Sequence, residues 1–336
     1  MRAVVITKHG GPGVLQVQER PDPALGPGEV RIDVAAAGIN FADVMARLGF
    51  YPDAPKTPCV VGYEVAGTIL ELGEGASSPA RPLSPGQRVV AGTKFGGHAS
   101  QAVAPVSDVV PLPDRLTFEQ GAAIPVNYVT AWAALIGYGS LQPGERVLIH
   151  SAGGGVGIAA TQIAKRYGAE VYGTASPGKH ARISELGVDH PLDYTASGWE
   201  RGLPRFDVIM DAVGGRSFRR DYSMLRAGGR LVAFGASAAV SGERRNLVKA
   251  LRTVLSMPRF NMVKQMSESK AVIALNMLSL WEDRGTLSPW IEPLRELIDD
   301  GTIEPIVAGA FSFEEAGAAQ NMITERRNVG KVVLVP

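Results

Sequence analysis

The residues whose types and spacing most directly indicate chemistry are the glycines of Gly153–Gly157. An apolar run, Arg146–His150, precedes them, and a helix-like pattern follows. Glycine lets a backbone turn tightly and approach phosphates, and a helix N-terminus offers free N–H groups and the positive end of a dipole. An ordinary tight turn is the alternative, but the flanking strand and helix match the G-x-G-x-x-A dinucleotide pattern. We expect a pyrophosphate to bind at Gly154, Gly155, Val156 and Gly157.

The end of the next predicted strand indicates which dinucleotide binds. NAD sites usually place an Asp or Glu there to hold the ribose 2′-hydroxyl. This chain reads Val171-Tyr-Gly-Thr-Ala-Ser-Pro-Gly-Lys179 and has no acid at that point. Ser176 and Lys179 are able to donate hydrogen bonds to a 2′-phosphate. The alternative is that they cap and solubilise the next helix, but the missing acid and the present cation together favour NADPH.

Two further strand ends carry candidate cofactor contacts. Tyr194 follows Asp193 at the end of the third strand, where it either covers the adenine or 2′-phosphate or simply packs. Phe234 and Gly235 end the fifth strand, where a ring and an open backbone could flank the nicotinamide.

The elements around these residues alternate between strands and helices. Strands are predicted at Arg146–His150, Glu170–Thr174, Val188–Asp193, Asp207–Ala212 and Arg230–Phe234, with helices between them, and Ala271–Leu275 is a candidate last strand. This alternation indicates a doubly wound parallel sheet of the Rossmann type.

The rest of the chain predicts a second, β-rich domain. Short apolar runs at Ala3–Ile6, Val30–Ala36, Glu64–Leu72 and Arg88–Ala91 are separated by Gly and Pro. Thr117-x-x-Gln120 is a capping-box pattern with a helix expected near Tyr128–Ile136, and a strand at Lys331–Val335 is expected to rejoin the first domain. We therefore expect domains at 1–125, 126–275 and 276–336, with the Rossmann domain inserted in the other and a ligand cleft between them.

Composition excludes several classes of function. The chain has 336 residues, 34 Lys plus Arg and 33 Asp plus Glu, which argues against nucleic acid as a partner. Its single cysteine, Cys59, excludes an intramolecular disulfide and a Cys-rich zinc site, and five dispersed histidines suggest no metal. No run reaches transmembrane length, and the first residues resemble a strand rather than a secretory leader. A cytoplasmic protein is the expectation.

Motifs along the whole chain resemble one known family. Ala37-Gly-Ile-Asn-Phe-Ala-Asp43, Gly62-Tyr-Glu-Val-Ala-Gly67, Pro85-Gly-Gln-Arg-Val89 and the glycine turn occur in the order found in the medium-chain dehydrogenase/reductase superfamily, in its zinc-free quinone oxidoreductase branch. Gly173–His180, Asp193-Tyr194 and Asn328–Pro336 resemble the synaptic-vesicle amine-transport protein homologues in that branch. The resemblance implies a GroES-like catalytic domain beside the Rossmann domain.

Departures from the zinc alcohol dehydrogenases of that superfamily limit the chemistry. Asn40 and Tyr63 stand where those enzymes have a cysteine and a histidine, and Val126-Asn127 has no third ligand. Without a metal ion to polarise an alcohol or carbonyl, simple alcohol oxidation loses its mechanism. A quinone or an α,β-unsaturated carbonyl accepts hydride through its conjugation. We therefore expect an NADPH-dependent, zinc-independent oxidoreductase acting on such acceptors.

The resemblance also implies roles for individual residues. Tyr51 matches the acid tyrosine of related enoyl reductases, and Asn40 matches an asparagine that faces nicotinamide and substrate. Packing of Tyr51 beside Pro52 and a turn-stabilising role for Asn40 are the alternatives. Asp43 and Glu64 are expected to be structural anions. Positions that line the cofactor in relatives are Asn127, Thr130, Asn328 and Lys331.

One basic segment suggests a different function. Residues 244–264 contain six Lys or Arg and no acid, and Leu247, Leu251, Val254 and Leu255 fall at helical spacing. This pattern fits a helix on an anionic membrane, although Pro258 interrupts it, and a substrate-channel cover or subunit interface is the alternative. A nucleotide-sensing lipid- or protein-binding module is thus the second hypothesis. The resemblance implies a homodimer, with Ala271–Leu275 as the paired edge.

Overall fold

The chain forms two compact units. The structure, a computed structural model, describes residues 1–77, 82–240, 242 and 245–336. Unit 1 comprises 1–129, 242–245 and 278–336, and unit 2 comprises 130–241 and 246–277.

Unit 2 is built on a six-stranded parallel sheet with the order β11-β10-β9-β12-β13-β14. The strands are β9 (Arg146–Ile149), β10 (Glu170–Ala175), β11 (His190–Asp193), β12 (Phe206–Asp211), β13 (Leu225–Ala233) and β14 (Ala271–Ala274). The chain runs outward from β9 to β11 and then crosses back to β12, which lies beside β9. The topological switch point, where doubly wound sheets bind ligands, is therefore between β9 and β12.

Helices cover this sheet because its central strands are buried along nearly their whole length. All six residues of β12 are buried, as expected for a central parallel strand. The helix α4 packs on β9 and β10, and α6 packs on β12 and β13. The helices assigned to unit 2 are α4 (Gly155–Arg166), α5 (His180–Glu185), α6 (Ser217–Met224), α7 (Leu247–Leu255) and α8 (Met262–Glu268).

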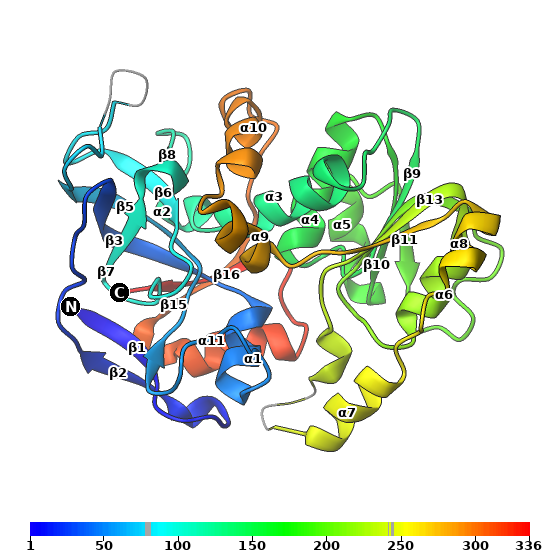
Figure 1. Ribbon diagram of the computed structural model, residues 1–336, viewed down its shortest axis with the longest axis horizontal. Coiled ribbons are helices and arrows are strands. Elements are labelled where there is room, and N and C mark those ends of the chain that lie inside the picture. The colour runs from blue at the N-terminus through cyan, green and yellow to red at the C-terminus, as the bar shows by residue number, and fades with distance from the viewer. Residues whose placement is uncertain (78–81, 241, 243–244) are drawn as a thin grey trace. The chain divides into compact units, whose positions relative to one another are not determined.

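Unit 1 contains two β-sheets. The smaller has the order β2-β1-β4, and the larger has the order β15-β16-β3-β5-β6-β8, with β7 also paired to β3. The red C-terminal strand β16 lies antiparallel to the blue strand β3 (Figure 1). The strands are β1 (Arg2–Ile6), β2 (Leu15–Glu19), β3 (Glu29–Ile39), β4 (Cys59–Val60), β5 (Glu64–Leu72), β6 (Arg88–Gly92), β7 (Gln101–Pro105), β8 (Val109–Pro111), β15 (Val307–Ser312) and β16 (Lys331–Val335).

Helices precede, connect and follow the strands of unit 1. They are α1 (Phe41–Leu48), α2 (Phe118–Gly121), α9 (Met277–Arg284), α10 (Ser288–Asp299) and α11 (Ala316–Thr324). The helix α3 (Pro125–Trp132) spans the division between the units and continues into a π-helical turn, Ala133–Gly137. The capping box at Thr117 is present, whereas the helix expected at Tyr128–Ile136 begins earlier and changes type.

The expected fold class is confirmed, and the main disagreements concern the segment after Met277. Local sequence patterns did not indicate α9, α10 or β15. Asp108 shows why: its carboxylate accepts hydrogen bonds from Trp281 Nε1 (2.7 Å) and the Leu287 N–H (2.8 Å). Such contacts join residues far apart in sequence, so a local pattern does not reveal them. In the part of the chain that the structure describes, no helix is long and apolar enough to span a membrane.

Candidate active site

The glycine turn joins β9 to α4 as expected. The helix α4 begins at Gly155, after Gly154, whose N–H donates to the Ser151 carbonyl at 2.8 Å. A Cβ atom on Gly157 would lie 2.4 Å from that same carbonyl oxygen, so this position requires glycine. The turn therefore leaves backbone N–H groups at a helix N-terminus open to a close anionic ligand, and it fits a dinucleotide pyrophosphate.

The other predicted cofactor residues of unit 2 follow the carboxyl ends of the neighbouring strands. Ser176 follows β10, whose last residue is Ala175, and Lys179 ends the short 3₁₀ turn after it; both are half-buried. Tyr194 directly follows β11 and is 36% exposed. Phe234 and Gly235 follow β13 and are half-buried. These residues and the glycine turn thus share one edge of one sheet.

Asn40 and Lys331 meet in a buried polar cluster of unit 1. Asn40 precedes α1, and Lys331 opens β16 and is only 3% exposed. Lys331 Nζ donates to Asn40 Oδ1 at 2.6 Å and forms an ion pair with Glu64. Glu64 accepts further hydrogen bonds from Asn40 Nδ2 (3.0 Å) and the Val126 N–H (2.6 Å). Both ends of the Asn40 amide are therefore held by protein partners.

Asp43 anchors the backbone around this cluster. Its carboxylate accepts from the N–H groups of Asn40 (2.7 Å) and Gly62 (3.2 Å), and His98 Nε2 lies 3.7 Å away. Burial raises the pKa of Asp43, while His98 and these hydrogen bonds oppose the shift. Asp43 and Glu64 thus have the contacts of structural anions.

Tyr51 belongs to an aromatic group after α1. Its ring lies edge-on to that of Tyr63, with centroids 6.3 Å apart, and Tyr63 in turn packs against Phe95 at 5.3 Å. Burial, with Asp53 adding to it, raises the pKa of Tyr51 to about 12. Burial also raises the pKa of Tyr63, whose hydroxyl has no hydrogen-bond partner among the described residues. Both phenols are therefore protonated donors at neutral pH.

The remaining predicted residues lie on two elements. Asn127 and Thr130 are buried on α3, with 4% and 7% exposure. Asn328 precedes β16 and donates from Nδ2 to the Gly330 carbonyl at 2.8 Å.

The side chains of unit 1 at the positions of zinc ligands do not form a zinc donor set. Zinc prefers thiolate, imidazole and carboxylate ligands. Asn40 offers an amide already bonded to Glu64 and Lys331, and Tyr63 offers a phenol whose high pKa keeps its proton on. These residues do not fit the metal that the zinc dehydrogenases carry at the corresponding positions.

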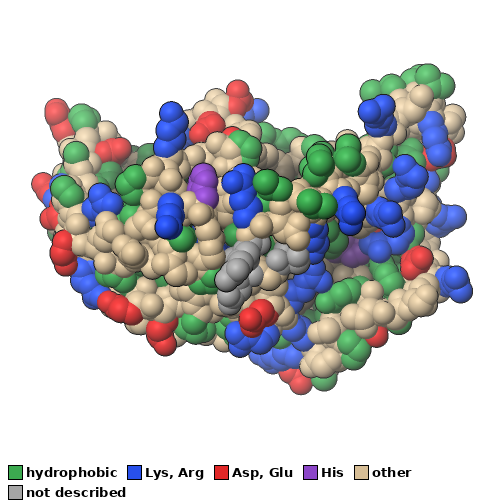
Figure 2. Space-filling model, turned by 90° about the horizontal axis from the view of Figure 1, so that it is seen from below, with side chains coloured by type: hydrophobic (Ala, Val, Ile, Leu, Met, Phe, Trp, Pro, Cys, Tyr) green, Lys and Arg blue, Asp and Glu red, His purple; other side chains and the backbone are tan. Residues whose placement is uncertain are grey.

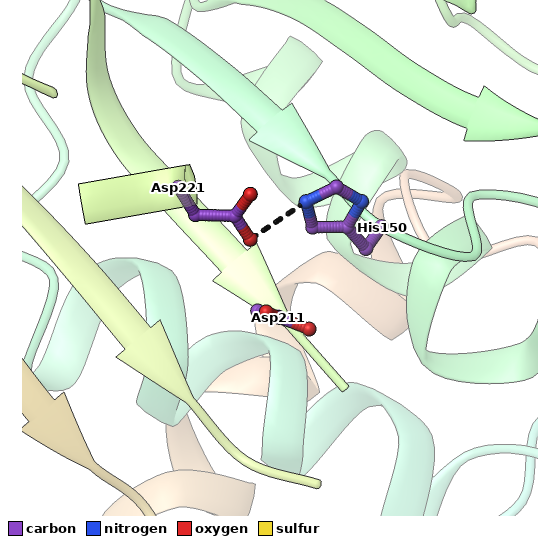
Figure 3. Close-up of side chains that lie close together, drawn as sticks. All are labelled: His150, Asp211 and Asp221. Carbon is purple, nitrogen blue, oxygen red and sulfur yellow. Dashed lines mark ion pairs between the residues drawn. The ribbon is translucent and has the colours of Figure 1, made fainter. Parts of the chain in front are cut away.

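Unit 2 also contains a buried group of titratable side chains that was not predicted from the sequence. His150, at the end of β9, lies with Nε2 2.8 Å from an oxygen of Asp221 on α6, and Asp211 at the end of β12 lies close to both (Figure 3). Arg220 Nε donates to the other Asp221 oxygen at 2.9 Å. Two basic side chains therefore face two acidic ones. We name these four residues the His150 cluster.

In the sequence, this cluster was indicated only by polar residues at the ends of two apolar strands. His150 and Asp211 each end a buried run, and parallel strands place such ends at the same sheet edge. Asp221 lies on a helix, and nothing in its local sequence indicates that it pairs with His150.

Family models match two parts of the chain. The model described as the alcohol dehydrogenase GroES-like domain matches residues 26–114, in the β-rich unit. The model described as zinc-binding dehydrogenase matches residues 186–334. The zinc named in this second description does not fit the side chains of Asn40 and Tyr63.

Individual relatives match the full chain. The human synaptic vesicle membrane protein VAT-1 homolog is 34% identical, and the match covers 100% of this chain and 86% of that protein. A mycobacterial structure complexed with NADPH is 30% identical with a TM-score of 0.85, and a Pseudomonas syringae quinone oxidoreductase is 28% identical with a TM-score of 0.84. Both matches cover 100% of this chain, and 100% and 99% of those chains. From the fold, the glycine turn and these matches together, the chain belongs to the medium-chain dehydrogenase/reductase superfamily, with the VAT-1 homologues among its relatives.

Proposed function

We propose that this protein is an NADPH-dependent, zinc-independent reductase that transfers hydride to quinones or α,β-unsaturated carbonyl compounds. The observation that carries the proposal is the pairing of two features. The first is the glycine turn, which fits a pyrophosphate and lies at the edge of the unit 2 sheet where β9 ends. In unit 1, amide and phenol groups occupy the positions where zinc-dependent relatives have metal ligands.

The residues at the sheet edge favour NADPH over NADH. The backbone N–H groups of Gly155, Val156 and Gly157 would bind the pyrophosphate. Ser176 and Lys179 follow a strand that ends in Ala175 rather than in an acid, and they would bind the 2′-phosphate. The mycobacterial relative with NADPH in its structure supports this choice. When bound, this cofactor supplies the hydride.

Tyr51 and the aromatic group of unit 1 suit a conjugated acceptor. Reduction of a quinone or enone places negative charge on its oxygen, which needs a hydrogen-bond donor. Tyr51, whose pKa of about 12 keeps it protonated, would donate to that oxygen and pass on its proton. The rings of Tyr63 and Phe95 would favour a planar, apolar acceptor. The Asn40 amide, whose orientation is fixed by Glu64 and Lys331, would line the acceptor site with a polar group.

A panel assay tests this function. Purified protein is mixed with NADPH or NADH and a set of quinones, enones, saturated ketones and alcohols, with and without a zinc chelator. We expect oxidation of NADPH with quinones or enones, much slower oxidation of NADH and no effect of the chelator. If no acceptor consumes NADPH, the proposal is wrong. Loss of activity with the chelator would contradict its metal-free part.

A second candidate function, binding to an anionic membrane surface, is favoured by α7 and α8. Their apolar side chains are exposed, among them Leu251 at 59%, Leu255 at 74% and Val263 at 74%. The basic residues Lys249 and Arg252 also belong to α7. Together with Arg216 they line a surface depression of about 620 Å³. Figure 2 shows hydrophobic and basic side chains interspersed on one face of the molecule. Arg244, part of the expected basic segment, lies outside the described residues.

Liposome flotation separates this candidate from the first. We expect binding to vesicles that contain anionic phospholipid and none to neutral vesicles, because both apolar contact and charge contribute. The double variant Lys249→Gln/Arg252→Gln should lose binding and retain any NADPH oxidation. Wild-type flotation by that variant would count against the membrane role.

A further inference from the structure

The His150 cluster lies at the switch point of the sheet, between the ends of β9 and β12. It contacts the loops that follow these two strands, at the sheet edge where we propose that the nucleotide binds. His150 lies three residues before Gly153, where the glycine turn begins. Its Nδ1 lies 3.1 Å from Thr174 Oγ1, and that same oxygen accepts the N–H of Ser151, which leads into the turn, at 3.2 Å. The His150 ring thus contacts the group that holds the beginning of the turn.

Asp211 holds the second loop. Its Oδ1 accepts the N–H groups of Val213 (2.5 Å) and Gly214 (3.3 Å), and its Oδ2 accepts from the Ser217 hydroxyl. The loop after β12 is therefore shaped by one carboxylate, which is itself fully buried. Figure 3 shows this carboxylate beside the His150–Asp221 pair.

We propose that His150, Asp211 and Asp221 form a proton-holding cluster that positions these two loops, and that nucleotide affinity follows the charge of the cluster. This inference rests on the nucleotide binding proposed above. The groups that face one another come from each neighbouring element: His150 from β9, Asp211 from β12, and Asp221 and Arg220 from α6. The Thr174 hydroxyl comes from β10, and Trp199 stacks below the Arg220 guanidinium at 4.7 Å.

The charge of the cluster changes in the physiological range. Burial, with Asp221 adding to it, raises the pKa of Asp211 to about 6. Burial would lower the pKa of His150, but Asp221 and Asp211 outweigh it and the net shift is upward. Burial would raise the pKa of Asp221, yet His150 and Arg220 lower it. With His150, Arg220 and Asp221 charged, the net charge is +1 when Asp211 is protonated and zero when it is ionised.

The sign of the effect follows from this charge. NADPH is a polyanion, and a more negative cluster beneath its loops disfavours it. As pH rises through about 6, Asp211 loses its proton and the cluster should bind the nucleotide less tightly. The 2′-phosphate of NADPH itself titrates in this range, so the test uses the ratio of variant to wild-type Kd at each pH, in which the titration of the ligand cancels.

Two variants give opposite predictions. Asp211→Asn is neutral at every pH and keeps an oxygen for the N–H groups of Val213 and Gly214. It should match wild type at pH 5.5 and bind NADPH about fivefold to tenfold more tightly at pH 8, at the low end of ordinary coupling energies. His150→Asn removes the imidazole that faces the two carboxylates, and because the pKa of His150 is raised, the variant should bind NADPH more weakly than wild type at pH 5.5.

Fluorescence titration of NADPH from pH 5.5 to 9 measures these ratios, with thermal melting to confirm folding. A purely structural role predicts weaker binding by both variants at all pH values, and such flat ratios would overturn the inference while leaving nucleotide binding intact. If wild type does not bind NADPH at any pH, the proposed function and this inference fail together. Stoichiometric zinc binding that Asp221→Asn abolishes would overturn the proton-holding role.

Discussion

At the scale of single residues, Asn40 shows what a sequence motif predicts and what only the structure reveals. The sequence placed Asn40 in a motif, but only the fold shows that Glu64 and Lys331 hold both ends of its amide. The Asn40–Lys331 contact spans 291 positions, so no spacing rule reveals it. The glycine turn was predictable because its strand, turn and helix are contiguous.

Tyr51 is the residue on which the proposed protonation depends. Tyr51→Phe should lower kcat for enone or quinone reduction by about 100-fold, the size expected for loss of a general acid, with little change in the Kd of NADPH. Steady-state kinetics and a nucleotide titration check both parts. Tyr138→Phe is the control, because Tyr138 directly follows the π-helical turn and is 37% exposed. Unchanged kcat in Tyr51→Phe would assign the packing role to Tyr51.

Lys179 is the residue on which the choice of nucleotide depends. Lys179→Ala should weaken NADPH binding by about tenfold, the size of one charge-assisted hydrogen bond to a phosphate, and should leave NADH binding nearly unchanged. Titrations with both nucleotides measure the ratio. Equal losses for the two nucleotides would show that Lys179 stabilises the fold of its loop rather than reading the 2′-phosphate.

At the scale of elements, the parallel sheet was predictable and the C-terminal helices were not. Most strands of unit 2 carry their own apolar run and a terminating turn, so periodicity located β9 to β14 to within a few residues, except that β13 begins five residues before the predicted strand. The helices α9 and α10 depend on contacts such as Trp281 with Asp108. Their boundaries follow from tertiary packing rather than from local pattern.

The junction of β9 and α4 gives an element-scale prediction. Gly157→Ala should abolish measurable NADPH binding, because the added methyl group would lie 2.4 Å from the Ser151 carbonyl oxygen and would push the turn apart. Gly13→Ala is the matched control, since a Cβ there meets nothing within 4 Å. Isothermal titration on both variants, after a melting curve, decides the matter. If Gly157→Ala binds NADPH with wild-type affinity, the glycine turn is not part of the nucleotide site.

At the scale of the whole molecule, the exposed edge of β14 matters most. β14 ends the parallel sheet, with Ala271 and Ala274 exposed. An unpaired edge strand is prone to associate, and two copies that pair across a two-fold axis would cover it. We propose a homodimer through this edge, as the family resemblance implies.

Light scattering tests the dimer. Wild type should have twice the mass of one chain, and Ala274→Lys should shift it toward one chain, because a lysine on an edge strand opposes strand pairing. Ala310→Lys places the same charge on another edge strand, β15, and should leave the mass unchanged. A wild-type mass equal to a single chain would contradict the proposal.

The central claim is that hydride passes from NADPH to a conjugated acceptor without a metal ion. The most direct measurement is turnover with NADPH deuterated at C4, followed by NMR of the product from an α,β-unsaturated ketone in the presence of a chelator. When NADPH deuterated at the 4R and at the 4S position is used in separate reactions, we expect deuterium on the β-carbon of the product from one of the two forms only. Product without deuterium from both forms, or no product from any enone or quinone, would contradict the claim.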